Sequence, residues 1–343
     1  MEIYFKRDNG PVDEAIHDLI EVVGGVRRPG IVREMILASL KAGQEDDGRV
    51  DLKLMNTSLK EMRFTAKAFS PYRDVRKVTV FGSARTRPDE AAYQMARFLG
   101  QKLAESGYMV ITGGGGGIMQ AVNEGAGPDY SFGVNIRLPF EQRSNPVIEG
   151  GLRNISYKYF FNRKVAFLKE SDAIVLFPGG FGTLDEAMET LTLVQTGKRN
   201  PVPLVLVDEP GGTYWMRWIE FVKETLLARG YISQSDLTLF ERVDSAEDAL
   251  QSINHFYARY HSLRYIDDLL VIRLTSGIEQ RKVEELKSRF SDILRPDGEM
   301  YLSGPLPEEM DEPEIEHLPR LILNFKRDDF GRLRQLIDAI NKD

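Results

Sequence analysis

Short apolar runs alternate with helix-like stretches from Val78 onward, and no other feature of the sequence constrains the fold as strongly. Each run has the length of a strand, and the stretches between them have the patterning of helices near residues 91–103, 159–168 and 214–227. Strands that are separated by helices in this way build parallel sheets covered by helices on both faces. The sequence therefore predicts a doubly wound, Rossmann-like α/β fold with strands at VTVFGS, MVITG, SFGVNIRL, DAIVLFP and PLVLVD.

The chain of 343 residues is longer than such a sheet requires. We expect an N-terminal extension over residues 1–74, the α/β domain over residues 75–260, and a small α+β domain over residues 261–343. In that last domain, the apolar runs LVIRL and LILNF alternate with helical patterns. A stretch flanked by prolines lies between these runs, and its acidic residues predict a solvated linker: Glu308, Glu309, Asp311, Glu312, Glu314 and Glu316.

The two ends of the chain share a short motif. Tyr4 to Asp8 reads YFKRD and Asn324 to Asp328 reads NFKRD, and each is followed by a helix-like stretch. So short a match is consistent with chance and equally with a common structure. In the second case the two ends form similar βα units that pack into one appended module.

Composition excludes several classes of function. The net charge of −7 argues against a surface that binds nucleic acid. The chain has no cysteine, and its four histidines lack the spacing of metal ligands, so we expect no metal site. No apolar run approaches the roughly 18 residues that span a bilayer. The N-terminus also lacks the order of a signal peptide. We therefore expect a cytoplasmic protein that does not bind membranes.

Five consecutive glycines, Gly113 to Gly117, stand between a predicted strand and a predicted helix. Glycine destabilises both kinds of element, so the run indicates a tight turn that approaches another group closely. That group is either a phosphate at the helix N-terminus, with Gly114, Gly115 and Gly117 as candidate contacts, or a neighbouring turn packed against the loop. The sequence leaves both interpretations open.

A second glycine-rich loop begins at Pro178, directly after the run DAIVLF, and leads into a helix. Its glycines, Gly179, Gly180 and Gly182, allow consecutive backbone N–H groups to converge, and Thr183 adds a hydroxyl. The dipole of the following helix favours an anion at the same place. The loop is therefore predicted to bind a phosphate monoester.

Several neighbouring side chains allow both a functional and a structural interpretation. Thr183 and Glu186 have the spacing of a capping box, but Glu186 is also a carboxylate beside the predicted phosphate site. Arg163, on the helix before DAIVLFP, forms either a surface ion pair or one wall of the crevice at the C-terminal end of that strand. Gly82 and Ser83 follow the first strand and are placed either to contact phosphate or sugar or to form a plain turn.

Together these segments resemble the Lonely Guy family, the cytokinin riboside 5′-monophosphate phosphoribohydrolases, many of which are labelled lysine decarboxylases. The family motif proline-glycine-glycine-x-glycine-threonine-x-x-glutamate is complete from Pro178 to Glu186. The family's arginine-lysine pair is matched by Arg163 and Lys164, and its glycine-rich motif by Gly113 to Met119. The resemblance covers the predicted α/β domain and leaves both ends of the chain outside it.

The resemblance implies hydrolysis of the N-glycosidic bond of a nucleoside 5′-monophosphate, with a purine or cytokinin-type base. It assigns Arg163 and Glu186 as the catalytic pair, the Gly179 to Thr183 loop as the phosphate cradle, and Lys164 as a substrate contact. It also implies a homodimer or higher homo-oligomer and no cofactor. The alternative is a sensor that binds a nucleotide or a nucleotide-like messenger without cleaving it. Lysine decarboxylation is not supported, because nothing in the sequence indicates a pyridoxal phosphate site.

Overall fold

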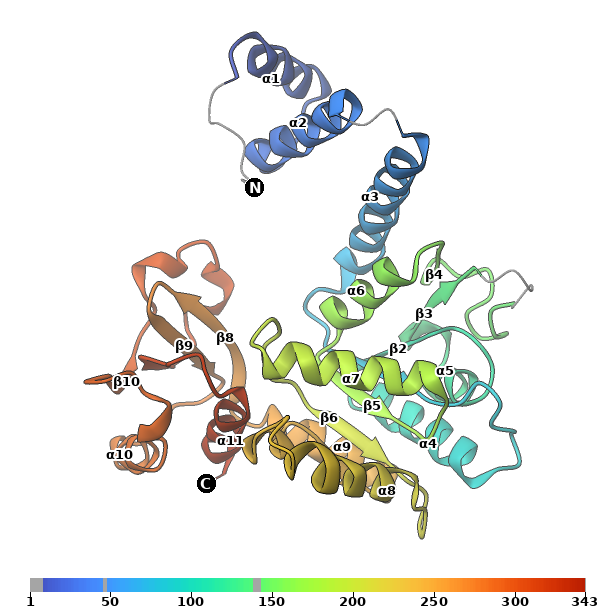
Figure 1. Ribbon diagram of the computed structural model, residues 1–343, viewed down its shortest axis with the longest axis vertical. Helices are drawn as coiled ribbons and strands as arrows, with labels where there is room; N and C mark the ends of the chain where they lie inside the picture. Colours follow the sequence, from blue (N-terminus) through green and yellow to red (C-terminus); the bar gives the residue numbers. More distant parts are fainter. Residues whose placement is uncertain (1–8, 46–47, 138–142, 343) are drawn as a thin grey trace. The chain divides into compact units, whose positions relative to one another are not determined.

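The computed structural model describes residues 9–45, 48–137 and 143–342 (Figure 1). The chain divides into two compact units, Met1–Phe64 and Thr65–Asp343. Three helices build the first unit: α1 (Pro11–Val23), α2 (Pro29–Glu45) and α3 (Arg49–Phe69), the last of which continues into the second unit. An ion pair of 2.7 Å between Asp13 and Arg33 joins α1 to α2.

A sheet of seven parallel strands forms the centre of the second unit in the described part of the chain, with the order β4-β3-β2-β1-β5-β6-β7. This confirms the predicted doubly wound α/β fold. The chain moves outward from β1 to β4, returns to β5 beside β1, and then continues in the other direction. The strands are β1 (Lys77–Phe81), β2 (Met109–Thr112), β3 (Ser131–Ile136), β4 (Asn154–Tyr157), β5 (Ala173–Leu176), β6 (Leu204–Val207) and β7 (Glu241–Val243).

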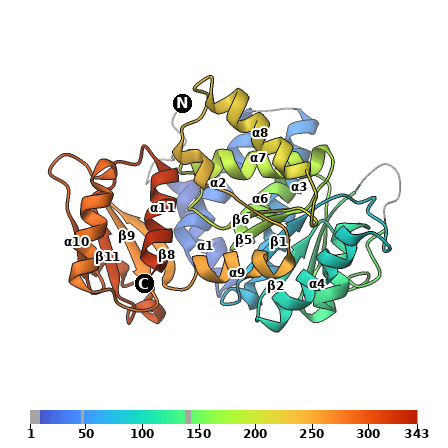
Figure 2. The same cartoon turned by 90° about the horizontal axis from the view of Figure 1, so that it is seen from below.

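Helices cover both faces of this sheet (Figure 2). Strand residues alternate between the two cores, so that Val78 and Val80 belong to one and Phe81 to the other. Because both faces are buried, the strands appear in the sequence as continuous apolar runs. On one face lie α4 (Ala91–Glu105), α5 (Ile118–Ala126) and α9 (Ala246–Phe256), and on the other α6 (Phe160–Glu170), α7 (Phe181–Gln195) and α8 (Tyr214–Phe221).

A second, antiparallel sheet follows α9, with the order β10-β11-β9-β8. Its strands are β8 (Tyr260–Ile266), β9 (Leu269–Leu274), β10 (Met300–Ser303) and β11 (Arg320–Leu323). The sequence predicted β9 and β11, the central strands, and missed both edge strands. Two helices, α10 (Gln280–Arg289) and α11 (Phe330–Asn341), share one apolar core with this sheet.

Helix α11 also packs against the large sheet's domain. Arg334 donates to the carbonyl oxygen of Val202 at 3.2 Å, and Ser235 donates to the carboxylate of Asp329 at 2.9 Å. The small sheet is thereby fixed to the α/β domain within one compact unit. Short helical turns complete the unit: η1 (Ser70–Tyr72), η2 (Pro128–Tyr130), the π-helical η3 (Val222–Leu227), η4 (Ser235–Thr238), η5 (Ser291–Ile293), η6 (Pro307–Glu309) and η7 (Pro313–Ile315).

Only one of the two matching terminal motifs can be described. Asn324 to Asp328 directly follows β11, and Phe325 is fully buried and forms an isolated bridge with Leu294. The other copy, Tyr4 to Asp8, lies outside the described residues. A module shared by the two ends therefore stays a prediction.

The acidic stretch before β11 is a solvated linker only in part, because Glu308, Asp311, Glu314 and Glu316 are exposed but Glu309 is buried. Glu309 is 4% exposed, and its carboxylate accepts hydrogen bonds from Arg273 at 2.8 Å and from Arg320 at 3.2 Å. Although burial raises the pKa of Glu309, the backbone N–H of Leu306 and the two arginines bring it below its usual value. The stretch folds over the small sheet because β9 and β11 each carry a buried arginine that needs a negative partner.

Glu309→Gln is expected to lower the free energy of unfolding by about 3 kcal/mol, since it leaves the buried Arg320 without a carboxylate partner, while Arg273 keeps its ion pair with Glu312. Urea-induced unfolding, followed by circular dichroism, measures this loss. Glu308→Gln is the matched control, because Glu308 is exposed and should change stability by less than about 0.5 kcal/mol. Equal stability of the two variants would contradict a structural role for the buried cluster.

Candidate functional site

A large cavity lies at the carboxyl ends of β1 and β5, where the strand order reverses. Open α/β sheets bind their ligands at such a switch point, because the loops after the two strands diverge there. The cavity has a volume of about 940 Å³. It is lined by Phe81, Gly82, Ser83, Ala84, Arg85, Gly113, Met119, Ile136, Phe160, Arg163, Phe167, Gly179, Gly180, Phe181, Gly182, Thr183, Leu184, Glu186 and Tyr214.

The loop after β5 presents unused backbone donors to this cavity. Helix α7 begins at Phe181, with Gly180 as its N-cap residue. Among the described residues, no hydrogen bond uses the backbone N–H groups of Gly180, Phe181 or Gly182. These groups therefore remain available, together with the positive end of the helix dipole, for an anion.

The capping-box interpretation of this loop is wrong. Because the N-cap residue is Gly180, Thr183 occupies the third helical position and cannot cap the helix start. Glu186 lies a full turn into α7, and no side chain in the helix makes a capping hydrogen bond. Both side chains belong to the cavity wall instead.

Close packing explains why Gly179 is a glycine. A Cβ atom at this position would lie 2.1 Å from Oγ1 of Thr183 and 3.1 Å from the backbone of Gly82. The loop after β5 and the loop after β1 thus touch through their backbones, and Ser83 N–H donates to the carbonyl of Pro178 at 3.0 Å. Gly82 and Ser83, predicted from the sequence, lie in the cavity wall as a result.

Gly113, the first residue of the five-glycine run, lines the cavity, and the rest of the run forms a close-packed turn. Gly114, Gly115 and Gly117, which the sequence suggested as phosphate contacts, do not line the cavity among the described residues. Gly117 has φ of 63° and leaves no room for a side chain, since a Cβ atom would lie 2.2 Å from the carbonyl oxygen of Ser83. Asn145 holds the same turn by donating to the carbonyls of Gly114 and Gly115 at 2.9 and 3.1 Å.

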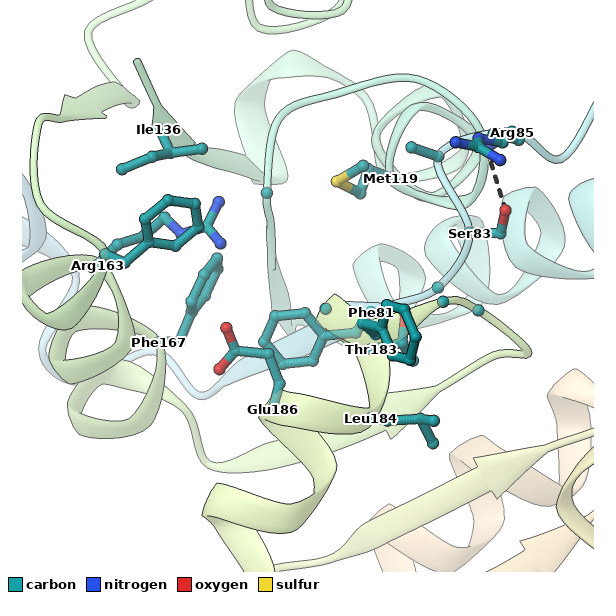
Figure 3. A pocket seen from close by; sticks show the side chains of 18 of the residues that line it. Phe81, Ser83, Arg85, Met119, Ile136, Arg163, Phe167, Thr183, Leu184 and Glu186 are labelled. Carbon is teal, nitrogen blue, oxygen red and sulfur yellow. Dashed lines mark hydrogen bonds between the residues drawn. The ribbon is translucent and has the colours of Figure 1, made fainter. Parts of the chain in front are cut away.

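Arg163 and Glu186 extend into the cavity from α6 and α7 (Figure 3). The guanidinium carbon of Arg163 lies 4.9 Å from the centre of the Phe160 ring and 5.5 Å from that of Phe167. Among the described residues, Oε2 of Glu186 and Nε of Arg163 are buried and have no hydrogen-bond partner. A buried carboxylate and a buried guanidinium, each with an unused polar atom, therefore face the same space.

Burial dominates the electrostatics of this pair. It raises the pKa of Glu186 from 4.5 to about 7, although the charges of Lys164 and Arg163 oppose that shift. Burial also lowers the pKa of Arg163, against the charges of Glu186 and Asp185. The carboxyl group is consequently able to exchange a proton near neutral pH.

Lys164 does not line the cavity, although the sequence suggested it as a substrate contact. Its ammonium group lies 2.7 Å from Oδ2 of Asp185 and 2.9 Å from Oε2 of Glu189. These ion pairs connect α6 to α7, the two helices that carry Arg163 and Glu186. The side chain is thus placed to hold the two helices together and to act on Glu186 through its charge.

Sequence reasoning missed the apolar wall of the cavity. Phe81, Met119, Ile136, Phe160 and Phe167 lie on this wall, and Figure 3 shows several of their side chains around Arg163 and Glu186. The sequence carries no signal for them, because these residues also belong to ordinary strand and helix patterns. Tyr214, at the start of α8, was missed as well, and no role was assigned to Arg85, which follows Gly82 and Ser83 in the same loop.

The described residues contain neither a membrane-spanning helix nor a cluster of metal ligands. None of their helices has the length and apolar character needed to cross a membrane. No group of three or more His, Asp or Glu side chains is arranged to hold a metal ion in the same residues.

Comparisons with known proteins agree with the motifs in this site. Residues 116–253 match the family model described as possible lysine decarboxylase. The cytokinin riboside 5′-monophosphate phosphoribohydrolase LOG of Oryza sativa subsp. japonica is 27% identical over 214 residues, which cover 60% of this chain and 84% of that protein. A probable cytokinin riboside 5′-monophosphate phosphoribohydrolase of the same organism, LOGL5, is 30% identical over 231 residues, which cover 64% and 87%.

Among solved structures, the molybdenum cofactor carrier protein of Chlamydomonas reinhardtii is 18% identical, with a TM-score of 0.38, and the match covers 52% of this chain and 96% of that one. The sequence relatives are matched over most of their own length, and the motifs from Pro178 to Glu186 and at Arg163 lie within one cavity. The chain belongs to the Lonely Guy family.

Proposed function

We propose that this protein hydrolyses the N-glycosidic bond of a nucleoside 5′-monophosphate and releases the free base and ribose 5-phosphate. The observation that carries the proposal is that one cavity combines free N–H groups at the start of α7 with the buried carboxylate of Glu186. The N–H groups suit a phosphate, and the carboxylate suits a positively charged sugar. The relatives' names, which specify a riboside 5′-monophosphate, support the same substrate class.

In the proposed reaction, a water molecule attacks C1′ of the ribose while the bond from C1′ to the base nitrogen breaks. The electrons of that bond go to the base, the attacking water gives a proton to the carboxylate of Glu186, and Glu186 is restored when one proton passes from it, directly or through solvent, to the departing base. Charge develops on the sugar as an oxocarbenium-like transition state, which an adjacent carboxylate stabilises. Arg163 positions the substrate beside Glu186, and the apolar wall with Phe160 and Phe167 accommodates a purine or cytokinin-type base.

The second candidate is a sensor that binds a nucleotide without cleaving it. A sensor would need the donors of Gly180 and Gly182 but not a buried, unpartnered carboxylate, which costs stability in the absence of a function. Glu186 therefore favours the enzyme. The family resemblance also implies a homodimer or a higher homo-oligomer. This stays a prediction, which a measurement of the protein's mass in solution would test.

A panel of purine and pyrimidine nucleoside 5′-monophosphates tests the proposal. We expect the full chain to convert at least one of them to free base and ribose 5-phosphate, without added metal or cofactor. Binding of several nucleotides with no release of base from any of them would favour the sensor. Neither binding nor turnover would contradict both candidates.

The activity is expected to rise with pH through about 7, because Glu186 must be ionised and burial holds its pKa near that value. Below this pH the neutral carboxyl group neither stabilises the sugar cation nor accepts a proton. The measurement is kcat/KM for adenosine monophosphate between pH 5 and pH 9. Glu189→Gln is the comparison variant: Glu189 does not line the cavity, but its charge raises the pKa of Glu186, so this variant should stay active and show the rise in activity at a lower pH. A profile that stays flat across pH 7 in the wild type would contradict the assignment of Glu186.

A further inference from the structure

Tyr214 contacts the proposed phosphate loop although it belongs to none of the motifs in the sequence. It is the first residue of α8, which follows β6, and its hydroxyl donates to the carbonyl oxygen of Gly179 at 2.7 Å. Its ring packs edge-on against the fully buried Trp215, with ring centres 4.9 Å apart. Burial raises the pKa of the hydroxyl, so it keeps its proton and remains a donor.

The peptide between Gly179 and Gly180 has no side chain on either side to fix its orientation. In a planar trans peptide the C=O and N–H groups point in opposite directions, so a rotation of this unit would exchange their places. β6 and β1 flank β5 on opposite sides. A hydroxyl from the β6 side that holds the carbonyl of Gly179 on that side would leave the N–H of Gly180 facing the β1 side, where Gly82 and Arg85 line the cavity.

We infer that Tyr214 is a positioning residue, whose hydroxyl holds the Gly179–Gly180 peptide so that the N–H of Gly180 donates to the 5′-phosphate. The inference rests on the proposed function. Without the hydroxyl, the peptide is free to turn its carbonyl oxygen toward the anion, which replaces an attraction by a repulsion. Loss of one hydrogen bond to a charged group corresponds to about tenfold weaker binding or more.

Tyr214→Phe removes the hydroxyl and keeps the ring. In titration calorimetry with the full chain, its Kd for ribose 5-phosphate is expected to be about tenfold above that of the wild type. The matched control is Tyr108→Phe, because the Tyr108 hydroxyl donates to Asn254 at 2.9 Å and the residue does not line the cavity. The control should bind ribose 5-phosphate as the wild type does. Ribose, which lacks the phosphate, should not distinguish the three proteins.

A second variant tests whether Tyr214 acts through the backbone of Gly180. Gly180→Pro removes the N–H group itself, and space is available because a Cβ atom at this position has no neighbour within 4 Å. Tyr214→Phe should lower kcat/KM for adenosine monophosphate by about tenfold in the wild type and by less than about twofold in the Gly180→Pro background. Melting temperatures of all variants monitor the fold.

The outcomes separate this inference from the proposed function. Equally tight binding of ribose 5-phosphate by the wild type and by Tyr214→Phe would overturn the positioning role alone. Equal effects of Tyr214→Phe in both backgrounds would overturn it as well, because the hydroxyl would then act independently of the Gly180 N–H. A wild type that binds neither ribose 5-phosphate nor any nucleoside monophosphate would overturn the proposed function together with it.

Discussion

Glu186→Gln is expected to lower kcat on a nucleoside 5′-monophosphate by about a thousandfold while changing the Kd of the nucleotide by less than about threefold. The amide has nearly the same size and fits the same buried position on α7. It cannot accept a proton from water or stabilise a positive charge on the sugar. Steady-state kinetics and calorimetric binding on the same preparation measure the two effects.

Stability provides the control for this variant. Burial raises the pKa of Glu186 from 4.5 to about 7, so the folded protein binds this proton more tightly than the unfolded chain does. The free energy of unfolding therefore falls as the pH rises from 4.5 through 7. Glu186→Gln should remove this cost and stabilise the protein at pH 8 by up to about 3 kcal/mol. A variant with unchanged turnover would contradict the catalytic role, and one with lost turnover and a lowered melting temperature would indicate a structural role.

We expect kcat/KM for adenosine to be about a thousandfold or more below kcat/KM for adenosine monophosphate, because adenosine lacks the 5′-phosphate. The phosphate would engage the N–H groups of Gly180, Phe181 and Gly182 and the positive end of α7. Binding energy from this remote group places the glycosidic bond beside Glu186, so turnover and affinity should both fall.

Adenosine 3′-monophosphate is the matched control for this comparison, because it has the same composition and charge but carries its phosphate at the wrong place. It should be hydrolysed as slowly as adenosine. Similar kcat/KM values for all three compounds would contradict the assignment of the loop after β5 as the phosphate site.

Five strands of the large sheet were predictable because they are buried on both faces, whereas its two edge strands, β4 and β7, were missed. Residues such as Val78, Val80 and Phe81 then form continuous apolar runs that differ clearly from the helices between them. The small sheet was predicted only at its centre, β9 and β11. Its edge strands, β8 and β10, contact fewer neighbours and contain polar residues, and β8 also has an irregular register near Tyr260.

The candidate site was predictable where a motif sets the backbone, and less so where side chains from distant segments meet. Arg163, Gly179 and Glu186 were named from the sequence and lie in one cavity, although their catalytic and binding roles stay predictions. The capping box at Thr183 was wrong because spacing alone does not show where a helix begins. Tyr214 could not be predicted, since its contact with Gly179 depends on the packing of α8 beside the loop after β5.

The glycine run and the acidic stretch were also hard to interpret from the sequence, because the groups that they contact lie on distant segments of the chain. Gly117 allows a close approach to Ser83, and the sequence could not distinguish a neighbouring turn from a phosphate as its partner. Glu309 looked like one charge among several in a solvated segment. Its burial depends on Arg273 and Arg320, which lie on separate strands and come together only in the folded sheet.

A product analysis with adenosine monophosphate tests the central claim most directly. The chain of 343 residues is incubated with this nucleotide, and adenine, ribose 5-phosphate, adenosine and inorganic phosphate are quantified over time by mass spectrometry and a phosphate assay. We expect adenine and ribose 5-phosphate in equal amounts, with neither adenosine nor inorganic phosphate. Adenosine and inorganic phosphate as the products, or an unchanged nucleotide that nevertheless binds to the protein, would contradict the claim.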